Sequence, residues 1–153
     1  MKTIFDPIIR AELKDRIQSI QENNKAQWGK MNVYQMAKHS TKWNDWLLGN
    51  GQFVYKQEFL GKLFGKMALK STTKNDKPVD KNIPAGKEFV VKEKDIDLNE
   101  QKVKWMSQID AFENYKNDAF IHDFFGKMTI EEIGIFVYKH NDHHLRQFNG
   151  IVH

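Results

Sequence analysis

The sequence contains no cysteine, only three prolines and no long apolar run among its 153 residues. The lack of cysteine excludes disulfides, iron–sulfur clusters, thiolate zinc sites and a thiol nucleophile of the protein's own. Nowhere do 18 or more apolar residues follow one another, so the sequence predicts no membrane-spanning helix. Metal or nucleophile chemistry would therefore have to come from histidine, carboxylate or hydroxyl groups.

Positive charge is in small excess, with 24 Lys and Arg against 20 Asp and Glu. Only three of these cations are arginines, and the lysines are spread from one end of the sequence to the other. Proteins that bind nucleic acids cluster their charge and use arginine for bidentate contacts. We therefore expect no nucleic-acid partner, and the lack of a long apolar run leads us to expect no membrane partner. The N-terminal residues have no apolar core of signal-peptide length, so we expect a cytoplasmic location.

Four segments have the apolar periodicity of amphipathic helices. The first starts at Asp6-Pro7, the second after Asn32, the third near Asp97, and the fourth at a capping box of Thr129 and Glu132. Their apolar stripes are Ile9, Leu13, Ile17 and Ile20; Val33, Met36, Trp43 and Leu47; Leu98, Trp105, Ile109 and Phe112; and Ile133, Phe136 and Val137.

Residues 51–95 separate the two pairs of helices and have a different pattern. We expect a short amphipathic helix over 59–69, a loop rich in turn formers over 71–88, and a brief extended piece at 89–91. Short linkers within each pair favour antiparallel hairpins, and the long middle segment can cross the bundle. The sequence predicts a single all-α domain over 1–153: a four-helix bundle of two antiparallel hairpins with a long crossover between helices 2 and 3.

Three histidines fall on the inward stripes of these helices. His140 and His144 are four residues apart, about 40° around a helix and about 6 Å along it, and they continue the apolar stripe of the last helix. His39 lies on the stripe of the second helix, between Met36 and Trp43. Two helices would thus supply three imidazoles to one divalent metal ion and leave a coordination position open. A buried histidine can instead be a hydrogen-bonded core residue, and this alternative stays open.

Each of four neighbouring residues has two interpretations. His143 is rotated about 100° from His144, so it either faces a neighbouring helix or solvent, or it acts as a proton shuttle. Gln147 either orients a ligand or makes an inter-helix hydrogen bond. Arg146 forms a salt bridge or binds an anion, and His122 is a loop residue or folds over the end of the bundle.

Three motifs resemble the DinB/YfiT-like superfamily. Met36-Ala37-Lys38-His39 resembles its second-helix motif, and the segment from His140 to Phe148 resembles its C-terminal His-x-x-x-His-x-x-Gln motif. The segment from His122 to Thr129 is similar to the His-Pro-Phe-Phe-Gly-Lys-x-Thr motif that precedes the last helix in one branch of largely unknown function, with Asp123 in place of proline.

The resemblance implies a four-helix bundle with a long crossover, and a divalent ion, nickel or zinc, held by His39, His140 and His144. Characterised relatives include transferases and isomerases that use low-molecular-weight thiols such as bacillithiol, mycothiol or glutathione. Others are labelled metal-dependent hydrolases.

Three functions follow from these observations. An ion held by three neutral imidazoles lowers the pKa of bound water to about 7 and converts a bound thiol to thiolate. Without cysteine, a thiolate must arrive with a cosubstrate, which favours a thiol-dependent transferase acting on a small molecule. The alternatives are a hydrolase that uses metal-bound water, and a non-enzymatic stress protein that binds a metal or small ligand. Each of these three functions is compatible with a homodimer. No general base stands out, because Asp142 points about 160° away from His140.

Overall fold

The computed structural model describes residues 1–83, 86–93 and 95–149 of the chain. In these ranges the structure contains helices and no strands, apart from an isolated bridge between His122 and Gly126. The α-helices are α1 (Pro7–Ser19), α2 (Val33–Leu48), α3 (Phe59–Thr73), α4 (Leu98–Ala111) and α5 (Ile130–Gln147), and the 3-10 helices are η1 (Lys87–Phe89) and η2 (Phe112–Asn114). The prediction of an all-α protein is confirmed. Within the described ranges, no helix combines the length and the apolar character needed to cross a bilayer.

The helices begin and end where local side-chain chemistry favours it. Asp6, Asn32, Asp97 and Thr129 each accept a hydrogen bond from a backbone N–H in the first turn of the helix that follows. Asn32 and Thr129 are each part of a complete capping box. The second helix ends at Gly49, whose φ of 76° lies in the left-handed region that glycine adopts without a Cβ penalty.

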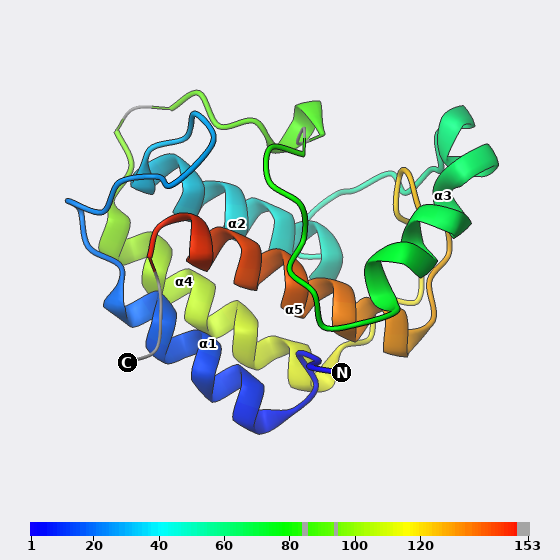
Figure 1. Ribbon diagram of the computed structural model, residues 1–153, viewed down its shortest axis with the longest axis horizontal. Coiled ribbons are helices and arrows are strands. Elements are labelled where there is room, and N and C mark those ends of the chain that lie inside the picture. Colours follow the sequence, from blue (N-terminus) through cyan, green and yellow to red (C-terminus); the bar gives the residue numbers. More distant parts are fainter. Residues whose placement is uncertain (84–85, 94, 150–153) are drawn as a thin grey trace.

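Four of these helices pack against one another around a common core (Figure 1). α4 contacts α1 and α2, and α5 contacts the same two helices. In Figure 1, α2 and α4 run in one direction while α1 and α5 run in the other. The largest fully buried side chains are Trp105, Phe112, Phe148, Ile4, Leu13, Ile17, Ile20, Met36, Leu47, Leu69, Ile109 and Leu145. This packing brings the inward faces of α2 and α5 together.

Three connecting segments differ from expectation. α3 continues to Thr73 and projects from the packed helices, contacting α5 (Figure 1). Phe89, expected to begin an extended piece over 89–91, is instead the last residue of η1 and is buried. The connection between α4 and α5 spans 112–129 and includes η2, so it is longer than the short linker that the sequence suggested. The predicted crossover also includes residues 84–85 and 94, which lie outside the described ranges.

Candidate metal centre

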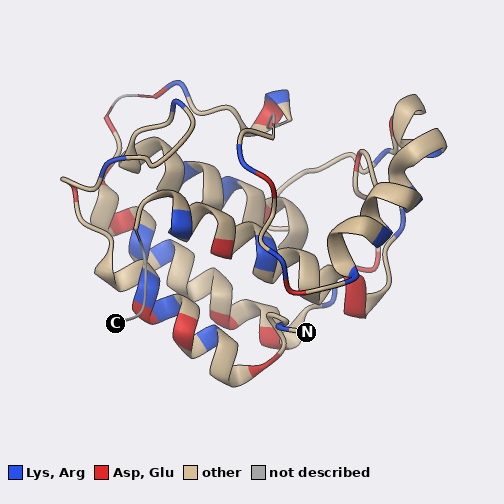
Figure 2. Cartoon of the chain, in the orientation of Figure 1, with Lys and Arg blue, Asp and Glu red and all other residues tan. Residues whose placement is uncertain are grey.

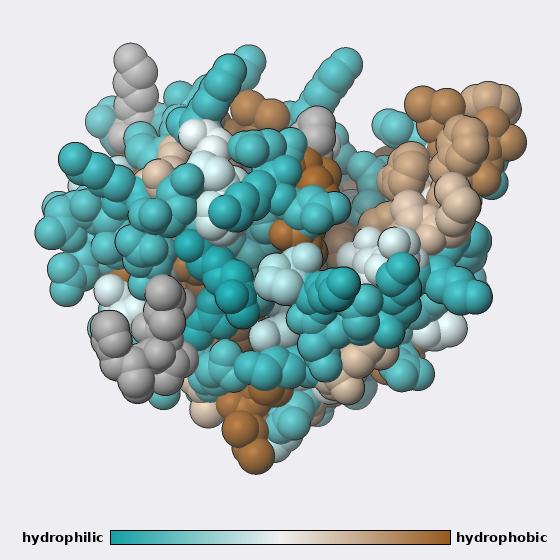
Figure 3. Space-filling model, viewed as in Figure 1, coloured by the Kyte–Doolittle hydropathy of each residue, from teal (hydrophilic) through white to brown (hydrophobic). Residues whose placement is uncertain are grey.

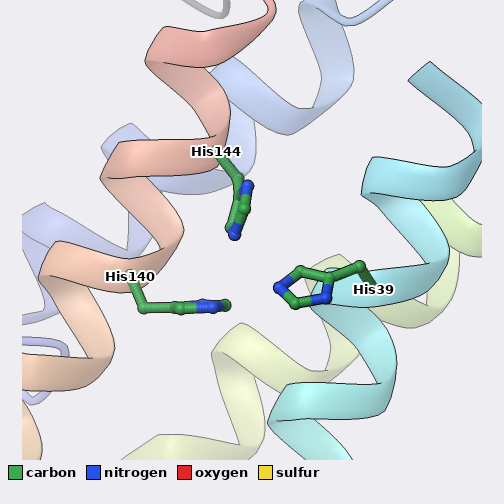
Figure 4. Close-up of side chains that lie close together, drawn as sticks. All are labelled: His39, His140 and His144. Carbon is green, nitrogen blue, oxygen red and sulfur yellow. The ribbon is translucent and has the colours of Figure 1, made fainter. Parts of the chain in front are cut away.

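The structure brings His39 of α2 together with His140 and His144 of α5 (Figure 4). Each histidine offers one ring nitrogen, and the three nitrogens all lie within 4.8 Å of one another. The ring of His39 lies 5.4 Å from that of His140 and 4.7 Å from that of His144, centroid to centroid. The predicted trio is therefore a single cluster, in which the rings point toward one another from two helices.

His39 is held by a backbone carbonyl group. Its Nδ1 lies 2.9 Å from the carbonyl oxygen of Phe89 in η1. A carbonyl oxygen can only accept a hydrogen bond, so Nδ1 carries the proton and Nε2 keeps its lone pair. Metal-binding histidines commonly donate their second N–H in this way, which fixes both the tautomer and the orientation of the ring.

His144 is held by a side-chain amide on its own helix. Its Nδ1 lies 3.0 Å from Oε1 of Gln147, whose Nε2 donates to the carbonyl oxygen of Trp28 at 2.8 Å. Because the amide nitrogen donates to Trp28, the amide oxygen must accept from His144, and the Nε2 lone pair of His144 is free. Gln147 therefore contacts the histidine and also ties α5 to the segment between α1 and α2.

His140 is held by an aromatic ring and has an unsatisfied nitrogen. Its imidazole stacks on Trp43 of α2, with centroids 3.7 Å apart and planes 10° from parallel. Its buried Nδ1 has no hydrogen-bond partner among the described residues. A buried polar atom without a partner is costly and needs an explanation, such as an ion. This orphaned nitrogen beside two correctly oriented imidazoles fits a metal site.

Burial keeps the three imidazoles neutral. It lowers the pKa of His140 and His144 well below the usual histidine value, and the proximity of the other histidines lowers both further. Burial also lowers the pKa of His39, although the hydrogen bond to Phe89 acts in the opposite direction. Metal ions bind the neutral form of histidine, so the cluster is in its ligating state at neutral pH.

Two other histidines lie near the cluster without joining it. His143 is partly buried, packs edge-on against Trp28 at 5.4 Å and has its pKa lowered by burial. His122 is buried in the turn before α5, where its ring stacks on Phe125 and its Nδ1 lies 2.8 Å from Oδ1 of Asp123. The aspartate that replaces the expected proline thus contacts His122.

No carboxylate belongs to the cluster within the described part of the chain. Asp142 is buried on α5, and its two oxygens lie 2.8 Å from Nη1 of Arg16 and 2.7 Å from Nε of Arg146. Arg146 therefore forms a salt bridge, and Asp142 pairs with both Arg16 and Arg146.

Sequence reasoning missed two contacts that position the ligands. The apolar stripe of the second helix placed Trp43 on the inward face, but it did not indicate that Trp43 stacks on His140. The carbonyl of Phe89 gave no sequence signal, because every residue type carries the same carbonyl group.

The fold and the site together define an all-helical protein with a candidate centre of three imidazoles. The chain matches the family model described as "Protein of unknown function (DUF1569)" over residues 11–150 and therefore belongs to this family. All three histidines of the cluster fall within the matched range. No curated protein and no solved structure matches the chain.

Proposed function

We propose that this protein binds a divalent metal ion, nickel or zinc, through His39, His140 and His144. The observation that carries the proposal is the convergence of three neutral imidazole nitrogens within 4.8 Å, at a position where the buried Nδ1 of His140 has no other partner. Imidazole ligands suit both metals. The same proposal places the chain in the DinB/YfiT-like superfamily, as a four-helix bundle with a crossover between α2 and α4.

We further propose a thiol-dependent transferase that acts on a small molecule. A divalent ion held by three neutral ligands keeps its positive charge and lowers the pKa of a thiol or a water molecule that it binds. Hydrolysis commonly also needs a general base, and the cluster contains no carboxylate among the described residues. A thiol ionises more readily than water, so this donor set favours an imported low-molecular-weight thiol.

An open groove shares one residue with the support of the cluster. It has a volume of about 420 Å³, and its lining contains none of the three histidines; it is lined by Lys42, Asp45, Trp46, Asn50, Gln52, Phe53, Val54, Glu88 and Phe89. This volume lies within the usual range for small-molecule sites. Phe89 belongs both to this groove and, through its carbonyl group, to the support of His39. This shared residue is the reason for proposing the groove as the binding site of the second substrate.

Metal analysis tests the first part of the proposal. Protein purified without added metal should hold close to one equivalent of nickel or zinc, and His140→Ala/His144→Ala should hold almost none. His143→Ala is the matched control, because it removes a neighbouring imidazole outside the cluster, and it should keep its metal. The metal proposal would be wrong if the wild type held less than about a tenth of an equivalent and His39→Ala had the same metal content. The three histidines would then be core residues that bind no ion.

A cobalt-substituted protein tests the second part. Adding a low-molecular-weight thiol should produce a thiolate-to-cobalt absorption band, and Gln147→Leu should weaken it by loosening His144. Ester or amide hydrolysis without thiol, combined with an unchanged cobalt spectrum, would instead indicate a hydrolase. An unchanged spectrum without turnover of either kind would indicate a metal-binding protein that is not an enzyme.

A further inference from the structure

α3 presents an apolar face that no other described part of the chain covers. Five large apolar side chains within three turns are between 50 and 74 % exposed: Phe59, Leu60, Leu63, Phe64 and Met67. They form the apolar surface over α3 at the right of Figure 3. A contiguous exposed apolar surface of this kind marks an interaction site more often than isolated exposed residues do.

The packing of α3 fixes this face outward. Gly61 and Gly65 lie one turn apart on the opposite side of the helix and are buried against the backbone of Phe124. A Cβ atom at either position would lie within 2.3 Å of the carbonyl oxygen of Phe124. Only glycine permits this approach. If the helix rotated to bury its bulky apolar residues, it would lose its close contact with the backbone of Phe124.

The net positive charge of the protein is concentrated on the same segment. Residues 56–74 contain five lysines and one acidic residue, a formal charge of +4 that equals the charge of the whole chain. The rest of the sequence contains 19 basic and 19 acidic residues and is formally neutral. All five lysines are exposed, and those of α3 follow the helix in Figure 2. The even spread of lysines expected from the sequence therefore hides an uneven distribution of net charge.

Lysine and apolar residues occupy adjoining sides of α3. Lys62, Lys66 and Lys70 recur every four residues and so follow one flank of the helix, beside Phe59 and Leu63. A helix with large apolar residues on its outer face and lysines on a flank matches the pattern of helices that lie in the plane of a membrane interface. Lysine stems can extend along such a surface while the ammonium groups reach the headgroups.

We propose that α3 docks the protein on an anionic lipid surface, with its apolar face among the acyl chains and its lysines at the headgroups. The concentrated charge selects this occupant over a second copy of the chain, because a symmetric α3–α3 contact would bring two segments of +4 together. The expectation of no membrane partner rested on the lack of a long apolar run, which excludes a spanning helix but not one lying in the interface. The proposal does not depend on a bound metal.

Vesicle co-sedimentation of the full-length protein tests this proposal. Wild-type protein should bind mixed phosphatidylcholine–phosphatidylserine vesicles, bind pure phosphatidylcholine weakly, and dissociate as salt rises. Each lysine near an anionic surface contributes about five-fold to the partition coefficient. Lys62→Gln/Lys70→Gln removes two of them and should lower the coefficient for the anionic vesicles roughly 25-fold. Lys66 is left unchanged because it donates a hydrogen bond to the carbonyl oxygen of Lys127.

The apolar contribution is tested with a matched pair of variants. Leu63→Glu/Met67→Glu should abolish vesicle binding, whereas Ile8→Glu/Val103→Glu, at exposed apolar positions on α1 and α4, should bind as the wild type does. Circular dichroism confirms that each variant is folded. The proposal is overturned if the wild type does not bind anionic vesicles, or if Leu63→Glu/Met67→Glu binds them as strongly as the wild type does. A wild-type dimer that this variant dissociates, without any vesicle binding, would show that the face joins two copies instead.

Discussion

At the scale of single residues, each imidazole of the cluster is held by a different kind of contact. A backbone carbonyl orients His39, an amide orients His144, and an indole ring stacks on His140. The two hydrogen bonds select the tautomer, and the stacking restricts rotation of the third ring. A centre preorganised in this way loses less side-chain entropy when it binds an ion.

Gln147 provides the most direct test of this preorganisation. Gln147→Leu keeps the approximate volume but removes the acceptor for Nδ1 of His144, so zinc affinity should fall about 10- to 100-fold. Competition with a chromogenic chelator measures the change. Gln147→Glu restores an acceptor and should recover most of the affinity. Equal affinity in all three proteins would mean that Gln147 serves only its contact with Trp28.

Protonation of the cluster predicts how stability depends on pH. The folded-state pKa values of His39, His140 and His144 are lowered, so between those values and the unfolded value near 6.5 the unfolded chain binds more protons. Their contribution to stability is present above pH 6.5 and is lost as the pH falls toward the folded-state values. For metal-free protein, the free energy of unfolding should decrease by up to about 1.4 kcal/mol per pH unit for each histidine.

Urea denaturation of chelator-treated protein at several pH values measures this slope. The variant His140→Leu/His144→Leu lacks two of the three groups and should show a much shallower dependence between pH 7.5 and 5. If the variant and the wild type lose stability in parallel, other groups dominate the acid sensitivity.

At the scale of elements, α3 packs through two glycines in its first half and through the buried Leu69 further on. In an exposed helix, Gly65→Ala would stabilise by about 1 kcal/mol through helix propensity. Here the new Cβ would lie 2.1 Å from the carbonyl oxygen of Phe124, which is backbone and cannot swing aside. We therefore expect Gly65→Ala to destabilise the protein by about 1–3 kcal/mol, as overpacking does.

Equilibrium urea unfolding of Gly65→Ala gives the sign as well as the size of the effect. Ser71→Ala, at an exposed position of the same helix, is the control and should change stability by less than about 0.5 kcal/mol. A more stable Gly65→Ala would show that α3 is not seated tightly on the turn that contains Phe124.

How far the sequence predicts each element depends on the range of the interactions that determine it. The starts of α1, α2, α4 and α5 follow from the capping residues Asp6, Asn32, Asp97 and Thr129, whose hydrogen bonds are local. Helical periodicity, which is also local, predicted that the three histidines lie on the inward faces of their helices. The position of η1 over α2 depends on contacts between distant segments. Phe89 is 50 residues from His39 in sequence, and neither propensity nor spacing places its carbonyl group there.

At the scale of the whole molecule, the cluster lies between two helices that are far apart in the sequence. His39 is near the middle of α2, and its partners are on α5, just over one hundred residues later. An ion held by all three would link these helices only in the folded state, because the unfolded chain does not bring the ligands together. Ligand binding to the native state alone stabilises it by an amount that grows with the logarithm of ligand concentration.

Metal removal should therefore lower the stability of the whole domain rather than disturb one loop. At a free zinc concentration 1,000 times the dissociation constant, the linkage amounts to about 4 kcal/mol. A domain of this size would then melt on the order of 10 °C higher with zinc than after chelation. Calorimetry of wild-type and His140→Ala/His144→Ala protein measures this, and the variant should show almost no difference between the two conditions. Since α2 and α5 both contribute ligands, the rise in melting temperature should require His39 as much as His140. A wild-type increase that persists in His39→Ala would mean that zinc stabilises the protein from somewhere other than this cluster.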